Sequence, residues 1–568
     1  MQPNFFKICF KDMKIFKVCL VSAMLTAMST TAMAGGILTN TNQSIDFLRN
    51  PSRDAAIGLD GVYSNPAGVV FLPQGFHLGV NWQYAHQTRT INSTNEVFKY
   101  GKKNNGNTTK TFEGVADAPC IPSIQGAWNK GNWSMQFNFS VPGGGGSCSY
   151  DNGLGSFESV VGNIASKFMV LDQTAMKLNG LTTSLSPMYN KVVGTNPTTG
   201  APITLGDMAG VSEPAAIGVN NVGGYDMESY MEGRQYYFGF QLGAAYKLNP
   251  SLSVYGGLRL LYGTATYKAR ISNIMVKTGN SYEDFESFLP KVPAQLQQNV
   301  AVAQSHLTLI NKYEELGQPM TAELKAAQAE LKQGLAQMAA SKDEMAKLAK
   351  YSEGVNLLCN QSSVGVAPIV GIDYKLNEHF NFAAKYEFKT QIRMKNESTV
   401  FEASEIEAVN KYKDSEKVNE DVPALLTLGA QWSPISQVRL NAGGHYYFDK
   451  DAKWYGNSQQ KLKHNTYEIL AGVEWDVTDR LTVSLGGQLT RYGLTDEYMN
   501  DMSFVTPSYS YGFGANYKAT ADVTLKVAYF QTNYDTYNRT QTTATGGTMS
   551  DSFTRTNRVL GIGCEINL

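Results

Sequence analysis

The chain has 568 residues, of which 42% are hydrophobic and 17% charged, with 53 glycines and a formal net charge of −1 at pH 7. Ordinary soluble proteins carry about 25% charged residues and about 7% glycine, so this composition excludes a disordered chain and a basic nucleic-acid-binding protein. A helical membrane protein is excluded as well, because a spanning helix needs about 20 consecutive apolar residues and no such run follows residue 34. A large, glycine-rich and tyrosine-rich β protein remains.

Residues 1–34 have the pattern of a secretory signal peptide. Two lysines precede an apolar stretch over residues 18–28, and the small-residue ending Ala-Met-Ala follows. We therefore expect export and a mature chain that begins at Gly35. Met13 opens a well-formed signal by itself, so the sequence leaves open whether translation starts at Met1 or at Met13.

Residues 35–75 lack the alternation of a strand. They mix apolar residues with turn-formers, as in the run Ser-Asn-Pro-Ala-Gly over residues 64–68. If the strands that follow form a barrel, such a segment must either hang outside its mouth or fold into its lumen, and the apolar residues favour the lumen. We expect an N-terminal hatch, or plug, over residues 35–75.

The rest of the chain resolves into fourteen segments with period-two alternation, each bounded by turn residues. The segments cover residues 76–92, 119–129, 132–141, 235–248, 252–273, 362–375, 380–395, 423–432, 438–448, 465–477, 481–492, 508–518, 523–536 and 555–568. Bacterial single-chain barrels have an even number of strands. We therefore predict an all-β fold: a 14-stranded antiparallel transmembrane β-barrel over residues 76–568, with an N-terminal luminal hatch.

The connections between these segments alternate strictly between short turns and long loops. The long connections cover residues 93–118, 142–234, 274–361, 396–422, 449–464, 493–507 and 537–554. Outer-membrane barrels have this asymmetry, with tight periplasmic turns at one rim and long extracellular loops at the other. We expect the two longest connections, 142–234 and 274–361, to be extracellular loops.

The last predicted strand shows the parity expected of a wall in contact with lipid. Leu560, Ile562 and Ile566 fall on one face, whereas Gly561 and Glu565 fall on the other. We expect a monomeric, multi-pass β-barrel in the outer membrane of a Gram-negative cell, with outer-membrane lipid around it.

One short motif in the predicted hatch resembles a known family. The run Ser64-Asn65-Pro66-Ala67-Gly68, between a signal peptide and a fourteen-strand barrel, resembles the hatch of the FadL family of outer-membrane transporters for long-chain fatty acids and other hydrophobic compounds. The chain departs from the family's pattern at residues 50–54, where a glycine-rich stretch is usual, and ends in Leu568 instead of a phenylalanine. The resemblance implies a hatch motif of Asn65, Pro66 and Ala67. It also implies passive uptake of hydrophobic small molecules, foremost long-chain fatty acids, by loop capture, hatch rearrangement and lateral diffusion.

The third predicted strand ends in a break at Pro142, Gly143, Gly144 and Gly145. Proline cannot donate a ladder hydrogen bond, and consecutive glycines have no side chains that hold a strand in register. The family resemblance implies a lateral opening in the wall at these residues. A flexible start to a long loop is the alternative interpretation of the same residues.

The third long connection, 274–361, is the one clearly helical region of the sequence. Apolar residues recur at helical spacing over residues 296–310 and again over 324–345, with Gly317-Gln318-Pro319 as a break. We expect a helical hairpin in this extracellular loop. Its apolar stripes either pack against each other or, as the resemblance implies for such loops, line a groove that first captures an apolar ligand.

Four inward-facing cations are candidates to bind a ligand carboxylate: Arg259, Arg393, Lys385 and Arg439. Inward-facing carboxylates are also present, so we expect most of these cations to form ion pairs that brace the plug and the wall.

The sequence contains no HExxH, CxxC, P-loop, dinucleotide or GxSxG motif. We expect neither an enzyme nor a metal site, a cofactor or a nucleic-acid partner. The alternatives to a transporter are a haem-capturing outer-membrane receptor, for which His306 and Tyr313 at helical spacing give a weak case, and a structural or adhesive barrel. The sequence leaves open whether Cys120 and Cys148 pair.

Overall fold

The computed structural model describes residues 44–348, 355–399, 411–542 and 547–568. The predicted signal peptide, 1–34, and the first nine residues of the predicted hatch, 35–43, lie outside the described residues.

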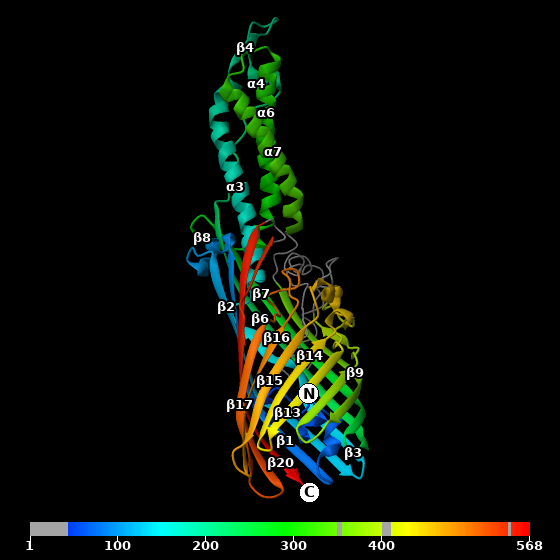
Figure 1. The fold of residues 1–568 in the computed structure, drawn as a ribbon. Coiled ribbons are helices and arrows are strands. Elements are labelled where there is room, and N and C mark those ends of the chain that lie inside the picture. The colour runs from blue at the N-terminus through cyan, green and yellow to red at the C-terminus, as the bar shows by residue number, and fades with distance from the viewer. Residues whose placement is uncertain (1–43, 349–354, 400–410, 543–546) are drawn as a thin grey trace, which may run out of the picture.

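Fourteen strands form a closed antiparallel β-barrel, which confirms the predicted fold (Figure 1). The first strand pairs with the second on one side and with the last on the other, so the sheet closes on itself. The wall strands are β1 (Gly75–Asn95), β2 (Thr109–Lys130), β3 (Trp133–Tyr150), β6 (Val222–Asn249), β7 (Leu252–Thr278), β9 (Val355–Lys375), β10 (Phe380–Glu387), β13 (Leu425–Ile435), β14 (Val438–Tyr447), β15 (Tyr467–Asp476), β16 (Leu481–Arg491), β17 (Ser508–Lys518), β18 (Val523–Tyr534) and β20 (Thr548–Asn567).

Smaller elements extend the sheet and fill the loops. The short strands are β4 (Val192–Thr195), β5 (Pro202–Thr204), β8 (Ser281–Asp284), β11 (Arg393–Ser398), β12 (Lys417–Asn419) and β19 (Tyr537–Thr542). The 3-10 helices of the loops are η3 (Glu96–Tyr100), η4 (Lys102–Asn104), η6 (Asp449–Asp451) and η7 (Tyr455–Lys461).

The outer surface of the barrel is apolar. Leu485, Leu560 and Ile562 are each more than half exposed on this face. Tryptophans such as Trp133 and Trp475 are also more than half exposed, near strand ends. An apolar band bordered by aromatic side chains is the surface that a transmembrane barrel presents to lipid.

Several strands run further at their loop ends than the sequence predicted. The second begins at Thr109 instead of residue 119, the third continues to Tyr150 instead of ending at residue 141, and the last begins at Thr548 instead of residue 555. The predicted loop bounds 142–234 and 274–361 are therefore wrong, because the connections span 151–221 and 279–354. Most outward positions of these extensions are polar, so the hydrophobic alternation stops although β2 stays paired with β1 and β3 with β6.

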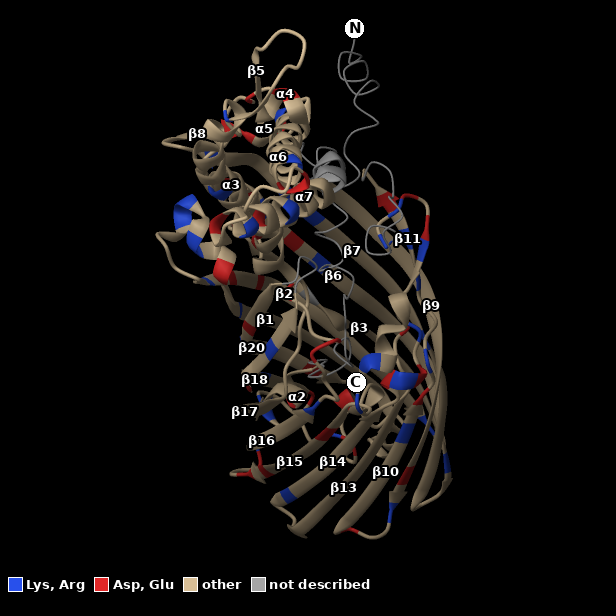
Figure 2. Ribbon diagram, turned by 90° about the horizontal axis from the view of Figure 1, so that it is seen from above, with Lys and Arg blue, Asp and Glu red and all other residues tan. Residues whose placement is uncertain are grey.

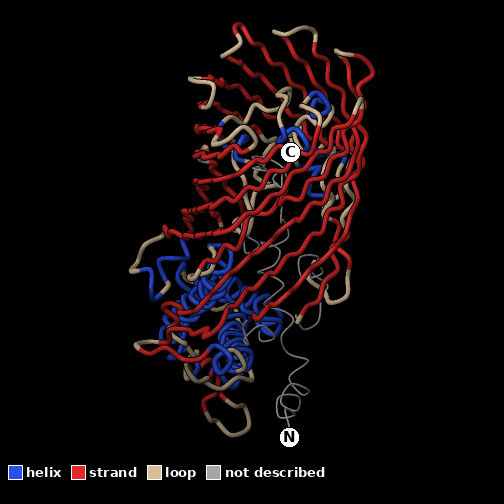
Figure 3. Tube along the Cα trace, turned by 90° about the horizontal axis from the view of Figure 1, so that it is seen from below, coloured by secondary structure: helices blue, strands red, loops and turns tan. Residues whose placement is uncertain are grey.

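A helical tower stands on the loop end of the barrel (Figures 1 and 3). It consists of α3 (Gly155–Tyr189), α4 (Leu205–Ala209), α5 (Phe285–Phe288), α6 (Lys291–Glu315) and α7 (Ala322–Leu348). The predicted hairpin is present as α6 and α7, but the restriction of helices to the third long connection was wrong, because α3 belongs to the second. Buried residues of α3, α6 and α7 share one apolar cluster, so the stripes of the hairpin pack inward.

In the described part of the chain, no helix combines the length and the apolar character needed to cross a membrane.

Residues 44–74 lie inside the ring of strands (Figure 2). They form α2 (Ile45–Arg49), η1 (Leu59–Val62) and η2 (Gly68–Phe71). α2 contacts β16, β17, β18 and β20, η1 contacts β1, β2 and β3, and η2 contacts β3, β6 and β9. Wall glycines make room for this segment: a Cβ added at Gly512 would lie 1.9 Å from the carbonyl oxygen of Leu48. We refer to residues 44–74 as the plug.

Candidate functional site

The Asn-Pro-Ala motif ties the plug to three wall strands. The Asn65 side-chain amide donates to Asp373 of β9 at 2.6 Å. The carbonyl of Pro66 accepts from Gln136 of β3 at 2.8 Å, and the carbonyl of Ala67 accepts a 2.7 Å hydrogen bond from the β7 serine at position 253. The motif thus forms the junction between one end of the plug and the wall.

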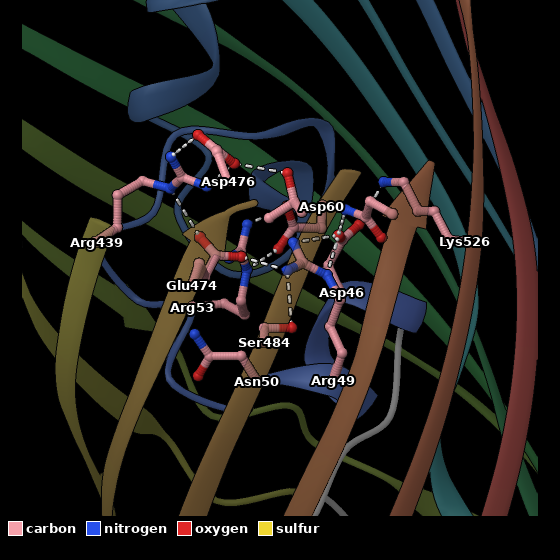
Figure 4. Close-up of polar contacts among 12 residues, drawn as sticks. Asp46, Arg49, Asn50, Arg53, Asp60, Arg439, Glu474, Asp476, Ser484 and Lys526 are labelled. Atoms are coloured by element: carbon pink, nitrogen blue, oxygen red, sulfur yellow. Dashed lines mark hydrogen bonds and ion pairs between the residues drawn. The ribbon is translucent and has the colours of Figure 1, made fainter. Parts of the chain in front are cut away.

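The other end of the plug is held by buried ion pairs (Figure 4). Arg53 forms a bidentate pair with Asp60 at 2.8 and 3.0 Å. The carboxylate of Glu474 on β15 receives Arg49 at 2.6 Å, Arg53 at 2.8 Å and Arg439 of β14 at 3.3 Å. One wall carboxylate therefore contacts three guanidinium groups, two of them from the plug.

A second wall contact starts from Asp46 in α2. Its carboxylate lies 2.8 Å from the Arg49 guanidinium and 2.5 Å from the Lys526 ammonium of β18. Lys526 also pairs with Glu565 of β20 at 2.6 Å. Burial alone would raise the pKa of Asp46, but the charges of Lys526 and Arg49 hold it well below its usual range. Asp46 thus joins α2 to β18, and Lys526 links this contact to β20.

A small cavity lies between the plug and the wall. Its lining combines apolar and polar groups, including Phe47, Pro51, Tyr63, Leu425, Thr427 and Tyr447. On its wall side, the two ring nitrogens of His445 lie 2.7 Å from Glu468 and 3.0 Å from Asp54 of the plug. His445 thus joins the wall to the plug beside this cavity.

Two of the four cations predicted to bind a ligand share one carboxylate. Arg259 and Lys385 both pair with Glu387, and Arg259 also donates to Gln241 at 2.7 and 3.1 Å. Lys385 donates to the plug carbonyl of Tyr63 at 2.8 Å. Both cations are buried and take part in the brace between plug and wall.

The other two predicted cations are paired as well. Arg439 forms a bidentate pair with Asp476 at 2.6 and 2.8 Å. Arg393 lies 3.2 Å from Asp421, and its side chain is 40% exposed. Each predicted cation thus has a carboxylate of the chain as its partner.

The wall is interrupted beside β3. The β2–β3 ladder stops between the pair Val115–Ser149 and the pair Ile124–Phe139, which leaves residues 116–123 facing 140–148 without ladder pairing. On the other side, β3 keeps its pairing with β6 but carries two register shifts, between residues 140 and 143 and between residues 143 and 146. Pro142, Gly143, Gly144 and Gly145 therefore lie within a continuous β3, at the height where its pairing with β2 is missing.

Backbone conformation at the interruption requires glycine. Gly144 has a φ of +111° and Gly146 a φ of +73°, a region that residues with a side chain rarely adopt.

The described residues contain no group of three or more His, Cys, Asp and Glu side chains that could hold a metal ion. Cys120 and Cys148 are free thiols, the first exposed and the second buried.

Neither family models nor curated proteins match the sequence. Solved structures do match the fold. A FadL homologue from Pseudomonas aeruginosa superimposes with a TM-score of 0.54 at 11% identity, over 94% of this chain and 99% of that chain. The toluene transporter TodX from P. putida gives a TM-score of 0.46 at 12% identity, over 90% and 94% of the two chains, and the CymD monoaromatic hydrocarbon channel gives 0.44 at 12%, over 95% and 99%.

The fold therefore defines a class: a fourteen-stranded transmembrane barrel with an N-terminal plug in its lumen. Within that class the chain has the fold of the FadL homologue, as the resemblance in the sequence predicted.

Proposed function

We propose that this protein is a monomeric transporter in the outer membrane of Gram-negative cells, which takes up hydrophobic compounds passively, foremost long-chain fatty acids. The single observation that carries the proposal is the interruption of the β2–β3 ladder beside the Pro142–Gly145 run, next to a plugged lumen. A plugged lumen suits neither an open pore nor a purely structural barrel, and the gap offers an exit toward the membrane.

Sideways release suits an apolar cargo. Exposing an acyl chain to water costs about 0.8 kcal/mol per methylene, or roughly 11 kcal/mol for a chain of about fourteen methylenes. A molecule that leaves between residues 116–123 and 140–148 passes directly from the lumen into lipid. The proposed route therefore runs from the loops to the lumen, past the plug, and out through the side of the barrel.

The plug contacts are suited to a local rearrangement at the hatch motif. Two of the three motif contacts are neutral hydrogen bonds, from Gln136 and from the β7 serine, each worth about 0.5–1.5 kcal/mol. The opposite end is anchored by buried ion pairs around Glu474. Movement at Asn65 to Ala67 thus requires far less free energy than release of the whole plug.

A two-residue deletion tests the exit route. Relative to β6, β3 carries one extra residue between positions 140 and 143 and another between 143 and 146. Deletion of Pro142 and Gly145 removes both extra residues. Because an even number of residues is lost, the remaining side chains of β3 keep their inward or outward orientation. We expect at least a tenfold loss of fatty-acid uptake in cells that have no other transporter, with unchanged ligand binding by the purified protein.

The matched control deletes Thr198 and Thr199 from the exposed turn between β4 and β5. Both variants are first checked for the heat-dependent gel mobility of a folded barrel. Unchanged uptake by the folded Pro142/Gly145 deletion would rule out exit through this gap.

The structure disfavours haem capture by His306 and Tyr313. His306 is fully buried, and its ring lies 3.1 Å from the Tyr189 hydroxyl inside the tower. Burial lowers the pKa of His306. Tyr313 is 5% exposed, so neither side chain is presented to a ligand.

A further inference from the structure

Two arginines face each other across the seam that closes the barrel. Arg89 of β1 and Arg555 of β20 are direct partners in the ladder. The inward face of each strand is marked by the buried residues two positions away, Ile91 and Phe553. Since side chains alternate along a strand, both guanidinium groups point into the lumen.

Neither arginine has an anionic partner among the described residues. Arg89 forms no side-chain hydrogen bond or ion pair there, and Arg555 donates only to the Phe504 carbonyl at 3.1 Å and to Gln87 at 3.3 Å. The Nε atoms of both arginines are buried without a hydrogen-bond partner. Buried charges in proteins are normally paired, and like charges directly opposite on neighbouring strands are destabilising.

Tyrosines flank the two arginines on the same face. The Arg555 guanidinium lies over the Tyr534 ring of β18, at 4.8 Å from its centroid. On the other side, Arg89 pairs with Gly114, and a Cβ there would lie 2.7 Å from the Tyr150 ring. The Tyr150 hydroxyl is buried, next to the Cys148 thiol and within electrostatic range of both arginines. The row of Arg89, Arg555 and Tyr150 therefore combines two cations with a hydroxyl group.

The row lies above the part of β1 that the plug covers. Lower on β1, Asn81 and Gln83 are fully covered, and Asn81 accepts a hydrogen bond from the Ile45 backbone of the plug. Gln87, Arg89 and Arg555 remain partly exposed although they face inward. A small molecule in the upper lumen can therefore reach the guanidinium groups.

An apolar surface leads from the arginines to the gap in the wall. Gly114, the partner of Arg89, is next to Val115, which marks the upper end of the β2–β3 interruption. Below it, Ala118 and Ile121 of β2 pack against Ala85 of β1 in a small apolar cluster that also includes plug and β20 residues. The charged row and the apolar surface thus follow each other along one route.

We propose that Arg89 and Arg555, with the hydroxyl group of Tyr150, bind the carboxylate of an apolar acid whose chain lies along Ala85, Ala118 and Ile121 toward the gap. This inference rests on the proposed function and narrows its cargo to acids, in contrast to neutral hydrocarbons. Two guanidinium groups supply the charge-assisted hydrogen bonds that carboxylates favour. The four paired cations considered above would first have to give up their own carboxylates.

The test compares an acid with its neutral analogue. The full-length protein in a non-ionic detergent is titrated with hexadecanoate and with hexadecan-1-ol, which share the same chain. We expect hexadecanoate to bind at least tenfold more tightly. In the double variant Arg89→Gln/Arg555→Gln, its affinity falls at least tenfold, whereas hexadecan-1-ol binding changes less than twofold.

Two controls isolate the site. Arg558→Gln removes an exposed, outward-facing arginine of the same strand and should leave both affinities unchanged. Arg89→Lys/Arg555→Lys keeps the charge and should restore part of the preference for the acid. The neutral double variant should also melt no lower than the parent protein, because it removes an uncompensated pair of like charges.

The outcomes separate the two proposals. If the unmodified protein binds the acid and the alcohol equally well, or the glutamine variant keeps its acid affinity, the arginine site is wrong and the proposed function stands. If the unmodified protein binds neither compound, both are wrong.

Discussion

Glu474 is the residue on which the seating of the plug depends most. Its carboxylate receives Arg49 and Arg53 from the plug and Arg439 from the neighbouring strand, and all three distances lie between 2.6 and 3.3 Å. The side chain of Glu474 is 5% exposed, so water cannot replace a lost partner. The charge of Glu474 thus compensates guanidinium groups from two parts of the chain.

Glu474→Gln tests this role. Breaking a buried ion pair from one side costs about 3–5 kcal/mol, because the remaining charge stays buried without compensation. We expect faster hydrogen exchange of backbone amides over residues 44–74, measured by mass spectrometry, while the wall strands keep their protection. Asp479→Asn, in an exposed turn, should change nothing. Equal protection of the plug in both variants would contradict the role assigned to Glu474.

The alternation of inward and outward side chains predicted the wall residues of these contacts but not their partners in the plug. Period-two alternation placed Arg439 and Glu474 on the inward face, because lipid forces the opposite face of a strand to be apolar. The plug partners of Glu474 follow no such period, and Arg53 is 421 positions away from Glu474. The same limit applies to Arg89 and Arg555: each is an ordinary inward polar residue until closure of the barrel makes the first and last strands neighbours.

At the scale of elements, the sequence signal was strong where the membrane imposes it and weak above the membrane. All fourteen wall strands were predicted, but the polar upper parts of β2, β3 and β20 were not. α3 was missed entirely: it combines apolar residues with many serines, threonines and asparagines, and its buried face is wide at one end and narrow at the other. Tertiary packing against α6 and the sheet stabilises a helix that shows no clean periodicity.

Phe168 tests how the tower is held together. It lies in α3 and packs edge-on against Phe288 of α5, with 5.1 Å between ring centroids. Truncation of a buried Phe to Ala costs about 3–5 kcal/mol. We expect Phe168→Ala to lower the melting temperature of the helical circular-dichroism signal while the barrel keeps its heat-dependent gel mobility.

The control for this variant is Val170→Ala, two residues along α3, where the side chain is 45% exposed. It should leave the helical transition in place. Loss of the barrel together with the tower in Phe168→Ala would show that the two do not unfold separately.

At the scale of the whole molecule, three parts meet at one place. The plug lies in the lower lumen and the tower stands over the loop end (Figures 1 and 2). The interruption of the β2–β3 ladder lies between them. The arginine row faces the lumen at the upper end of this interruption. In the function we propose, apolar cargo leaves sideways through this interruption.

Photo-crosslinking tests this claim most directly. The protein, reconstituted in lipid vesicles, is loaded with a long-chain fatty acid that carries a diazirine near the end of its chain, irradiated, digested and mapped by mass spectrometry. We predict label on residues 116–123 and 140–148 that excess unlabelled fatty acid removes, and loss of that label when Pro142 and Gly145 are deleted. Label confined to the plug and to the short turns at the opposite rim, with none on β2 or β3, would contradict lateral exit.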